Sequence, residues 1–150
     1  MIRTVPKSMI DEIWPAVEPL LKAAIGHHPF LTVEDLHGLV RDVDGADLLV
    51  AIEDGRVLGA AAIEIQAFEH ARTGHILACG GLDGFYERQL PAMTDALEAW
   101  ALARDCRAIS MLGRPGWAKF VSRRGWQVMP TVAAWRMLRS EPHAAAGSSA

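Results

Sequence analysis

The spacing of apolar residues changes from a helical to a strand period in the first half of this chain, and the change limits what the chain can fold into. From Ile10 to about Gly26, apolar side chains recur every three to four residues, as on one face of an amphipathic helix. From Asp47 to Ile52 and from Val57 to Ile65 they form short runs typical of strands. Both patterns fit within 150 residues, the length of one domain. We therefore expect an α+β protein rather than an all-helical or all-strand one.

Two helices are expected before the strands. The first contains Pro15 and Pro19, and each proline removes a backbone donor and clashes with the preceding turn. We therefore expect this helix to start late or to kink. The second helix is expected to begin after Thr32, whose hydroxyl can cap it, and Asp35 lies in its first turn, where negative charge is favourable. It should end by Gly45.

The central part of the chain predicts a hairpin, a third strand and a long helix. The dipeptide Asp54-Gly55 favours a tight turn, so the two apolar runs on either side of it should pair in antiparallel fashion. A third strand is expected near His75 to Cys79, before a glycine-rich segment. A long helix should run from near Leu90 to near Asp105, with a proline in its first turn.

The C-terminal part predicts shorter elements. We expect a strand from Ala108 to Leu112, a short helix from Trp117 to Arg124, and a final strand pair from Trp126 to Leu138 that a proline interrupts. These elements would complete a single domain over residues 1–139. Residues 140–150 are rich in alanine, glycine and serine and are expected to form a flexible tail.

Composition excludes several classes of protein. No run approaches the roughly 18 apolar residues that span a bilayer, and the N-terminus has no apolar segment of secretory length. We therefore expect a cytoplasmic protein with no membrane contact. Cys79 and Cys106 have no metal-like spacing, and the six histidines show no helical pairing next to a carboxylate, so no metal site is expected.

Charge is distributed unevenly along the chain. Residues 104–139 carry eight basic groups against one acidic group, whereas the preceding residues are strongly acidic. A basic segment of this kind could bind a phosphorylated cofactor, a nucleic acid or an acidic partner. It could equally be a solvated face covered by long arginine side chains. Nucleic acid is the weakest of these expectations.

The order of the expected elements resembles that of the GNAT superfamily of N-acetyltransferases. The segment from Glu98 to Met111 resembles the end of the central helix of this family entering its fifth strand, and Phe120 to Trp126 resembles the family's short helix and its glycine-aromatic entry into the last strands. The resemblance implies an α+β, three-layer fold. In that fold a mixed, mostly antiparallel central sheet has helices on both faces.

A narrower resemblance is to small GNAT-like proteins encoded in phage and prophage genomes. The matching segments are Gly80-Gly81, Trp100-Ala101 and Gly113-Arg114-Pro115-Gly116-Trp117. This resemblance implies an alternative function. The chain would be a catalytically degenerate phage or virion-associated protein that acts by binding phage or host proteins, and its location would be the virion.

The GNAT resemblance implies acetyl-CoA as acyl donor. Members bind its pyrophosphate at a helix N-terminus lined by small residues, where free N–H groups favour an anion. Aligned on Trp100, that motif falls on Phe85 to Leu90, so Arg88 and Leu90 occupy the small positions. Arg88 and Gln89 are therefore the candidate phosphate-binding residues, since a guanidinium matches phosphate geometry.

The remaining donor contacts would come from the middle strand. The resemblance implies a fold that opens between its two central strands and exposes backbone to the pantetheine arm. The residues that would face the acyl-CoA are Ile76, Leu77, Ala78 and Cys79.

Acyl transfer also needs a base that deprotonates the attacking amine. Glu64, Glu69 and His75 are the candidates, and histidine titrates near neutrality. The tyrosine that usually protonates the leaving thiolate is absent, because Val121 stands at its position. Two functions therefore remain open: N-acyl transfer to an unknown primary amine by direct attack, and the degenerate protein-binding alternative.

Overall fold

The computed structural model describes residues 1–26, 28–130 and 134–139. It divides into two compact units, Met1–Leu112 and Gly113–Ala150, which we describe separately. The elements, in chain order, are β1 (Ile2–Thr4), the 3₁₀ helix η1 (Lys7–Met9), α1 (Ile10–Ile25), α2 (Val33–Asp42), β2 (Ala46–Glu53), β3 (Arg56–Ala67), β4 (Arg72–Gly81), α3 (Phe85–Arg88), α4 (Leu90–Ala103), β5 (Ala108–Met111) and α5 (Gly116–Arg123).

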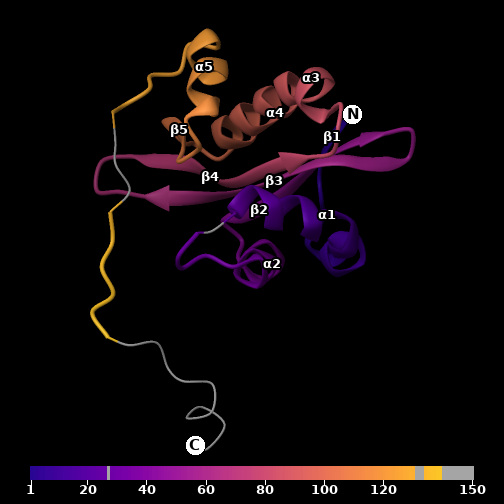
Figure 1. The fold of residues 1–150 in the computed structure, drawn as a ribbon, viewed down its shortest axis with the longest axis horizontal. Helices are drawn as coiled ribbons and strands as arrows, with labels where there is room; N and C mark the ends of the chain where they lie inside the picture. Colours follow the sequence, from indigo (N-terminus) through magenta and orange to yellow (C-terminus); the bar gives the residue numbers. More distant parts are fainter. Residues whose placement is uncertain (27, 131–133, 140–150) are drawn as a thin grey trace, which may run out of the picture. The chain divides into compact units, whose positions relative to one another are not determined.

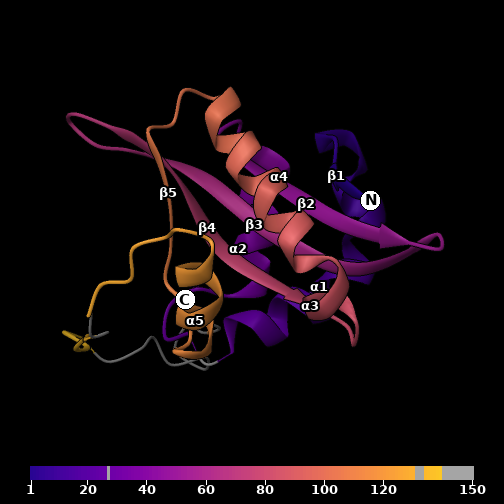
Figure 2. The ribbon, with the colours of Figure 1, turned by 90° about the horizontal axis from the view of Figure 1, so that it is seen from above.

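The first unit is built on one five-stranded sheet. Its strands follow the order β1-β2-β3-β4-β5, and every neighbouring pair is antiparallel except β4 and β5, which are parallel. Helices α1 and α2 cover one face of the sheet, and α3 and α4 cover the other (Figure 1). Figure 2 shows α4 lying obliquely across the strands. The predicted mixed, mostly antiparallel sheet between two helical layers is confirmed.

The turn between β2 and β3 has the geometry that its sequence predicts. Asp54 and Gly55 both have positive φ, at 52° and 74°, and Glu53 pairs with Arg56 across the turn. Two consecutive positive φ angles produce the twist that lets antiparallel strands continue without splaying. Glycine adopts this region at no steric cost, which is why a two-residue connection suffices here.

The two N-terminal helices differ in how well the sequence predicts them. Helix α2 begins with a capping box, because Thr32 Oγ1 accepts from the Asp35 backbone N–H while Asp35 accepts from the Thr32 N–H. Helix α1 runs unbroken from Ile10 through Pro15 and Pro19, so the expected late start is wrong. Both prolines are exposed, and water can therefore bind the carbonyls that lose their helical donors.

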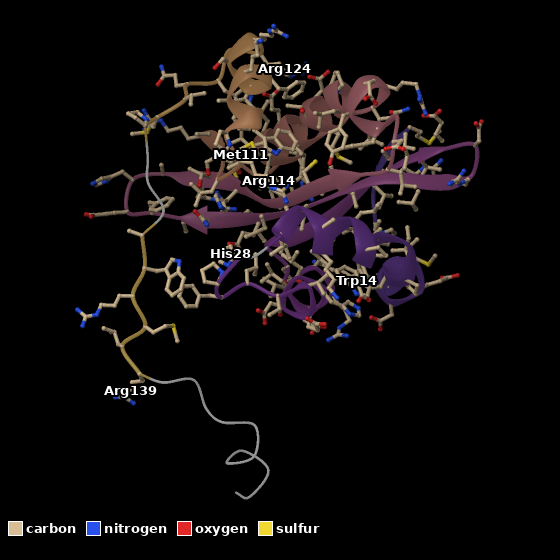
Figure 3. The ribbon with its side chains drawn as sticks, in the orientation of Figure 1. Trp14, His28, Met111, Arg114, Arg124 and Arg139 are labelled. Atoms are coloured by element: carbon tan, nitrogen blue, oxygen red, sulfur yellow. The ribbon has the colours of Figure 1, made fainter. Side chains whose placement is uncertain are left out.

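Aromatic stacking joins these two helices. The rings of Trp14 and His37 are parallel, with centroids 4.2 Å apart, and His37 Nε2 lies 2.8 Å from Asp11 Oδ1. Trp14 is labelled in Figure 3, in the helical layer below the sheet. This contact fixes α1 against α2 and leaves the buried faces of both helices to pack on the strands.

Two glycines let helices approach β4 from opposite faces. A Cβ at Gly80 would lie 2.7 Å from the carbonyl oxygen of Leu20 in α1. A Cβ at Gly74 would lie 3.0 Å from the Cβ of Ala101 in α4. Strand β4 is therefore in close contact with both helical layers, with α1 at Gly80 and with α4 at Gly74.

The second unit consists of α5 and the segment that follows it. Gly125 has a φ of 87°, and the Trp126 N–H donates to the Val121 carbonyl, which closes the end of the helix. The expected strand pair is wrong for residues 126–130 and 134–138, none of which is in a strand. Alternating apolar residues make a strand only where another backbone accepts its hydrogen bonds, and Pro130 removes a donor.

Three parts of the C-terminal prediction remain untested. Residues 131–133 of the expected strand pair and the whole expected tail, residues 140–150, lie outside the described residues. The single domain over residues 1–139 stays a prediction.

Candidate functional site

The parallel pairing of β4 with β5 covers four of the ten residues of β4. It runs from Thr73 opposite Ala108 to Ile76 opposite Met111, the last residue of β5 and labelled in Figure 3. Beyond that point β4 continues to Gly81, and among the described residues it pairs only with β3. The backbone groups of β4 that point toward β5 beyond Ile76 therefore have no strand partner, and an extended ligand can pair with them.

A β-bulge in β4 lies where this opening begins. Ala62 of β3 faces Ala78, whereas Ile63 faces Ile76, so Leu77 is an extra residue in the ladder. A bulge bends a strand and increases its twist. It therefore gives a local reason for β4 to separate from β5 immediately after Ile76.

Three polar residues lie in a row across β3, β4 and β5 beside this opening. Glu64 is paired with His75, and His75 is paired with Ser110, so all three side chains share one face of the sheet. The Nδ1 atom of His75 lies 2.9 Å from Ser110 Oγ. The row combines a carboxylate, an imidazole and a hydroxyl, the group types that move protons in acyl transfer.

The environment of His75 favours its neutral form. Burial lowers the pKa of His75 below its usual value of 6.5, and the charge of Glu64 opposes this effect only in part. At neutral pH the ring is therefore uncharged and has one nitrogen free to accept a proton.

Two further polar side chains extend the row along the same face. Gln66 Nε2 donates to Glu64 Oε1 at 3.4 Å, which places it beside the carboxylate. Thr73, two residues before His75 and so on the same face, has a buried Oγ1 atom with no partner among the described residues. Buried hydroxyls are normally hydrogen-bonded, so Thr73 Oγ1 is an unsatisfied polar atom beside the row.

The third candidate base lies elsewhere. Glu69 is in the turn between β3 and β4, its side chain is 87% exposed, and its contact is with His70 at 3.7 Å. The structure therefore brings Glu64 and His75 together and leaves Glu69 apart from them.

The candidate phosphate-binding residues turn away from the opening. Arg88 binds both carboxylate oxygens of Glu53, at 2.9 and 3.4 Å, and Gln89 Nε2 donates to the same carboxylate at 3.4 Å. Glu53 ends β2, which lies on the opposite side of β4 from β5. Hydrogen bonds from Arg88 and Gln89 lower the pKa of Glu53, so the pair is charged at neutral pH.

Backbone N–H groups at the expected pyrophosphate motif also have hydrogen-bond partners within the chain. Residues 85–88 form the short helix α3, and the N–H groups of Arg88 and Gln89 donate to the carbonyls of Gly84 and Phe85. Pro91, in the first turn of α4, has no N–H. The segment therefore offers fewer free donors to a diphosphate than an open helix N-terminus would.

The four residues expected to face an acyl-CoA span the bulge and the first part of the opening. Ala78 is buried against the α1 and α2 layer, and Leu77 packs against the same cluster. Burial raises the pKa of the Cys79 thiol to about 12, so this sulfur stays protonated and is a poor nucleophile. A ligand at residues 76–79 would therefore bind the backbone of this stretch.

Sequence analysis did not identify Gln66, Thr73 or Ser110. A hydroxyl within the otherwise apolar strand from Ala108 to Met111 was the one available signal, and its meaning depends on the parallel register with β4.

In the part of the chain that the structure describes, no three His, Cys, Asp or Glu side chains cluster as metal ligands, and no helix is long and apolar enough to cross a membrane.

A mixed sheet whose one parallel pair opens partway along, with helices on both faces, defines the GNAT-like α+β class. No protein-family model matches the sequence, and comparison with curated proteins gives no match.

Solved structures do match. The aminoglycoside N-acetyltransferase AAC(6')-Iy, bound to the bisubstrate analogue CoA-S-monomethyl-acetylneamine, is 19% identical over 91% of this chain and 97% of its own, with a TM-score of 0.70. Glucosamine-6-phosphate N-acetyltransferase from Arabidopsis thaliana is 16% identical over 93% and 98%, with a TM-score of 0.67. An acetyltransferase from Trypanosoma brucei is 18% identical over 91% and 99%, with a TM-score of 0.67. At these identities the likeness establishes the fold, which is that of the GNAT N-acetyltransferases.

Proposed function

We propose that this chain transfers an acyl group from an acyl-CoA to a primary amine by direct attack. The observation that carries the proposal is the unpaired edge of β4 beyond Ile76, which lies next to the neutral, half-buried imidazole of His75. The fold supports it as well, since solved structures with this fold include N-acetyltransferases and one of them is in complex with CoA.

The backbone of residues 77–79 would hold the acyl donor. An extended arm that carries amide groups pairs with an open strand edge in the same way as another strand does. When bound, the donor supplies a thioester, which is an activated acyl group. Arg88 contributes little to this binding, because Glu53 holds it on the other side of β4.

His75 would act as the base. When its Nδ1–H donates to Ser110 Oγ, the lone pair on Nε2 is free to take a proton from the attacking amine. The negative charge of Glu64 stabilises the imidazolium that forms. The same proton is then available for the departing thiolate, so transfer does not need a tyrosine at the position of Val121.

The acceptor would be a polar primary amine. Glu64 attracts an ammonium group, while Gln66, beside it, can hydrogen-bond a neighbouring polar group. Structures with this fold include acetyltransferases of an aminoglycoside and of glucosamine 6-phosphate, whose names both specify amine acceptors.

The second candidate is a degenerate GNAT-like protein that binds phage or host proteins, in the cytoplasm or in a virion. The observation that favours it is the engaged pyrophosphate segment: Arg88 is paired with Glu53, and the N–H groups of Arg88 and Gln89 are already bonded. A protein that had lost its donor site would show these features.

A calorimetric titration with acetyl-CoA separates the two candidates. The proposal predicts saturable binding to the wild type and to His75→Gln, and transfer to polyamine or amino-sugar acceptors by the wild type alone. Glu69→Gln is the matched control, because Glu69 lies outside the polar row, and it should bind and transfer normally. No heat at high protein concentration would overturn the transferase and leave the protein-binding candidate.

A further inference from the structure

In direct acyl transfer the Ser110 hydroxyl only accepts a hydrogen bond from His75, and its capacity to act as a nucleophile is not used. Ser110 is half-buried in β5, one residue before the pairing with β4 ends. Its Oγ atom lies 2.9 Å from His75 Nδ1, a normal hydrogen-bond distance for a serine and its base. A hydroxyl held against a neutral imidazole at the start of an open strand edge is placed to attack an acyl carbon.

We propose that Ser110 is a nucleophile that accepts an acyl group from activated esters and thioesters and that His75 is its base, which gives the chain an acyl-serine hydrolase activity. The activity uses the tautomer of His75 that carries its proton on Nε2. In that tautomer the Ser110 hydroxyl donates to Nδ1, and Nδ1 can take the proton.

The reaction balances in atoms and protons, because Ser110, His75 and water supply every group that it needs. A bond forms between Ser110 Oγ and the acyl carbon, the bond from that carbon to the thiolate or alkoxide breaks, and the hydroxyl proton passes through His75 to the leaving group. Water then attacks the acyl-serine, gives its proton to His75, and releases the carboxylic acid as the serine hydroxyl is restored. The net reaction consumes one ester or thioester and one water.

Glu64 completes the arrangement. It faces His75 across β3 and β4, and its charge favours the imidazolium that forms during each attack. Gln66 orients Glu64 through a hydrogen bond to Oε1. The row therefore has the order nucleophile, base and carboxylate that activates serine in unrelated hydrolases, here on three adjacent strands.

Thr73 is an independent observation at the same place. Its buried Oγ1 atom has no partner among the residues described and shares the face of His75. A buried hydroxyl without a partner costs free energy. The face that carries the serine and its base therefore holds one further polar atom whose hydrogen-bonding capacity the fold does not use.

The test uses p-nitrophenyl acetate, which carries an acetyl group and no CoA portion. The full chain should release nitrophenol in a burst that approaches one equivalent, and peptide mass spectrometry should find acetyl on Ser110. Ser110→Ala and His75→Gln should each reduce the burst at least about tenfold, while Ser8→Ala, at an exposed serine in η1, should leave it unchanged.

The possible outcomes decide between the two proposals. Acetyl on Ser110 without acetyl-CoA binding supports the hydrolase and overturns the transferase. Acetyl-CoA transfer that is retained in Ser110→Ala, with no acetyl on Ser110 in the wild type, overturns the hydrolase alone. A burst that persists in Ser110→Ala also overturns it, whatever the transferase does. Circular dichroism of both variants establishes that the loss is not unfolding.

Discussion

The indole Nε1 of Trp100 donates a 2.8 Å hydrogen bond to Oδ2 of Asp47, a carboxylate that is 8% exposed. The same carboxylate accepts from Arg104 at 3.1 Å, and Lys7 Nζ lies 3.4 Å from its other oxygen. Asp47 therefore joins β2, α4 and the segment before α1, and it is the one charged residue among the buried side chains described.

Removing this carboxylate should destabilise the fold. Asp47→Ala leaves the buried indole N–H without its acceptor and two cations without their counter-charge, so we expect a loss of about 2–4 kcal/mol in unfolding free energy. Asp47→Asn keeps an acceptor for Trp100 and should cost less. Urea denaturation measures both, with Asp44→Ala in an exposed turn as the control expected within about 0.5 kcal/mol of wild type. Equal stability of Asp47→Ala and Asp44→Ala would show that the network contributes nothing.

Local features were predictable from the sequence because nearby residues determine them. The Asp54-Gly55 turn, the Thr32 cap and the start of α4 at Leu90 all depend on residues within one turn of each other. The expected strand pair after Trp126 failed for the opposite reason, since a strand depends on a distant partner that its own sequence does not specify.

The candidate site was predictable only in part. Glu64 and His75 could be chosen by residue type, but Ser110 joins them through a parallel register that brings together residues 35 positions apart. Arg88 was chosen as a phosphate ligand because a guanidinium matches phosphate geometry. Glu53, which binds it, lies in a hairpin that the local sequence pattern does not connect to Arg88.

Glycine at position 59 should be essential for packing. A Cβ there would overlap the ring of Phe85, which is fully buried, and the same ring also covers Gly81. Gly59→Ala forces the ring to move in a close-packed core, which we expect to cost about 1–3 kcal/mol or more. Gly38→Ala is the matched control: nothing lies within 4 Å of its Cβ, and in the interior of α2 alanine should stabilise by about 0.5–1 kcal/mol. Thermal unfolding should therefore move in opposite directions in the two variants, and a shift in the same direction would contradict this account.

Arg88 should be nearly dispensable for donor binding. Because Glu53 binds it on the side of β4 away from β5, Arg88→Ala should change the dissociation constant of acetyl-CoA less than about fourfold, below 1 kcal/mol. Glu53→Gln weakens the ion pair and tests whether a released guanidinium then binds the diphosphate, which would tighten acetyl-CoA. Calorimetric titration of both variants and the wild type with acetyl-CoA measures the three dissociation constants. A loss of tenfold or more in Arg88→Ala would place this arginine on the donor, as the sequence alone suggested.

Acyl transfer should depend on pH through His75. The base is active when neutral, so kcat/KM should rise with pH through the pKa of His75, which burial places below 6.5, and level off by neutral pH. Glu64 raises that pKa, so Glu64→Gln should move the acid limb to lower pH, and it should also reduce the plateau because the imidazolium loses its counter-charge. Glu69→Gln, whose side chain is 87% exposed in the turn before β4, should leave the profile unchanged. An acid limb that stays in place in Glu64→Gln, or moves upward, would mean that a group other than His75 takes the proton.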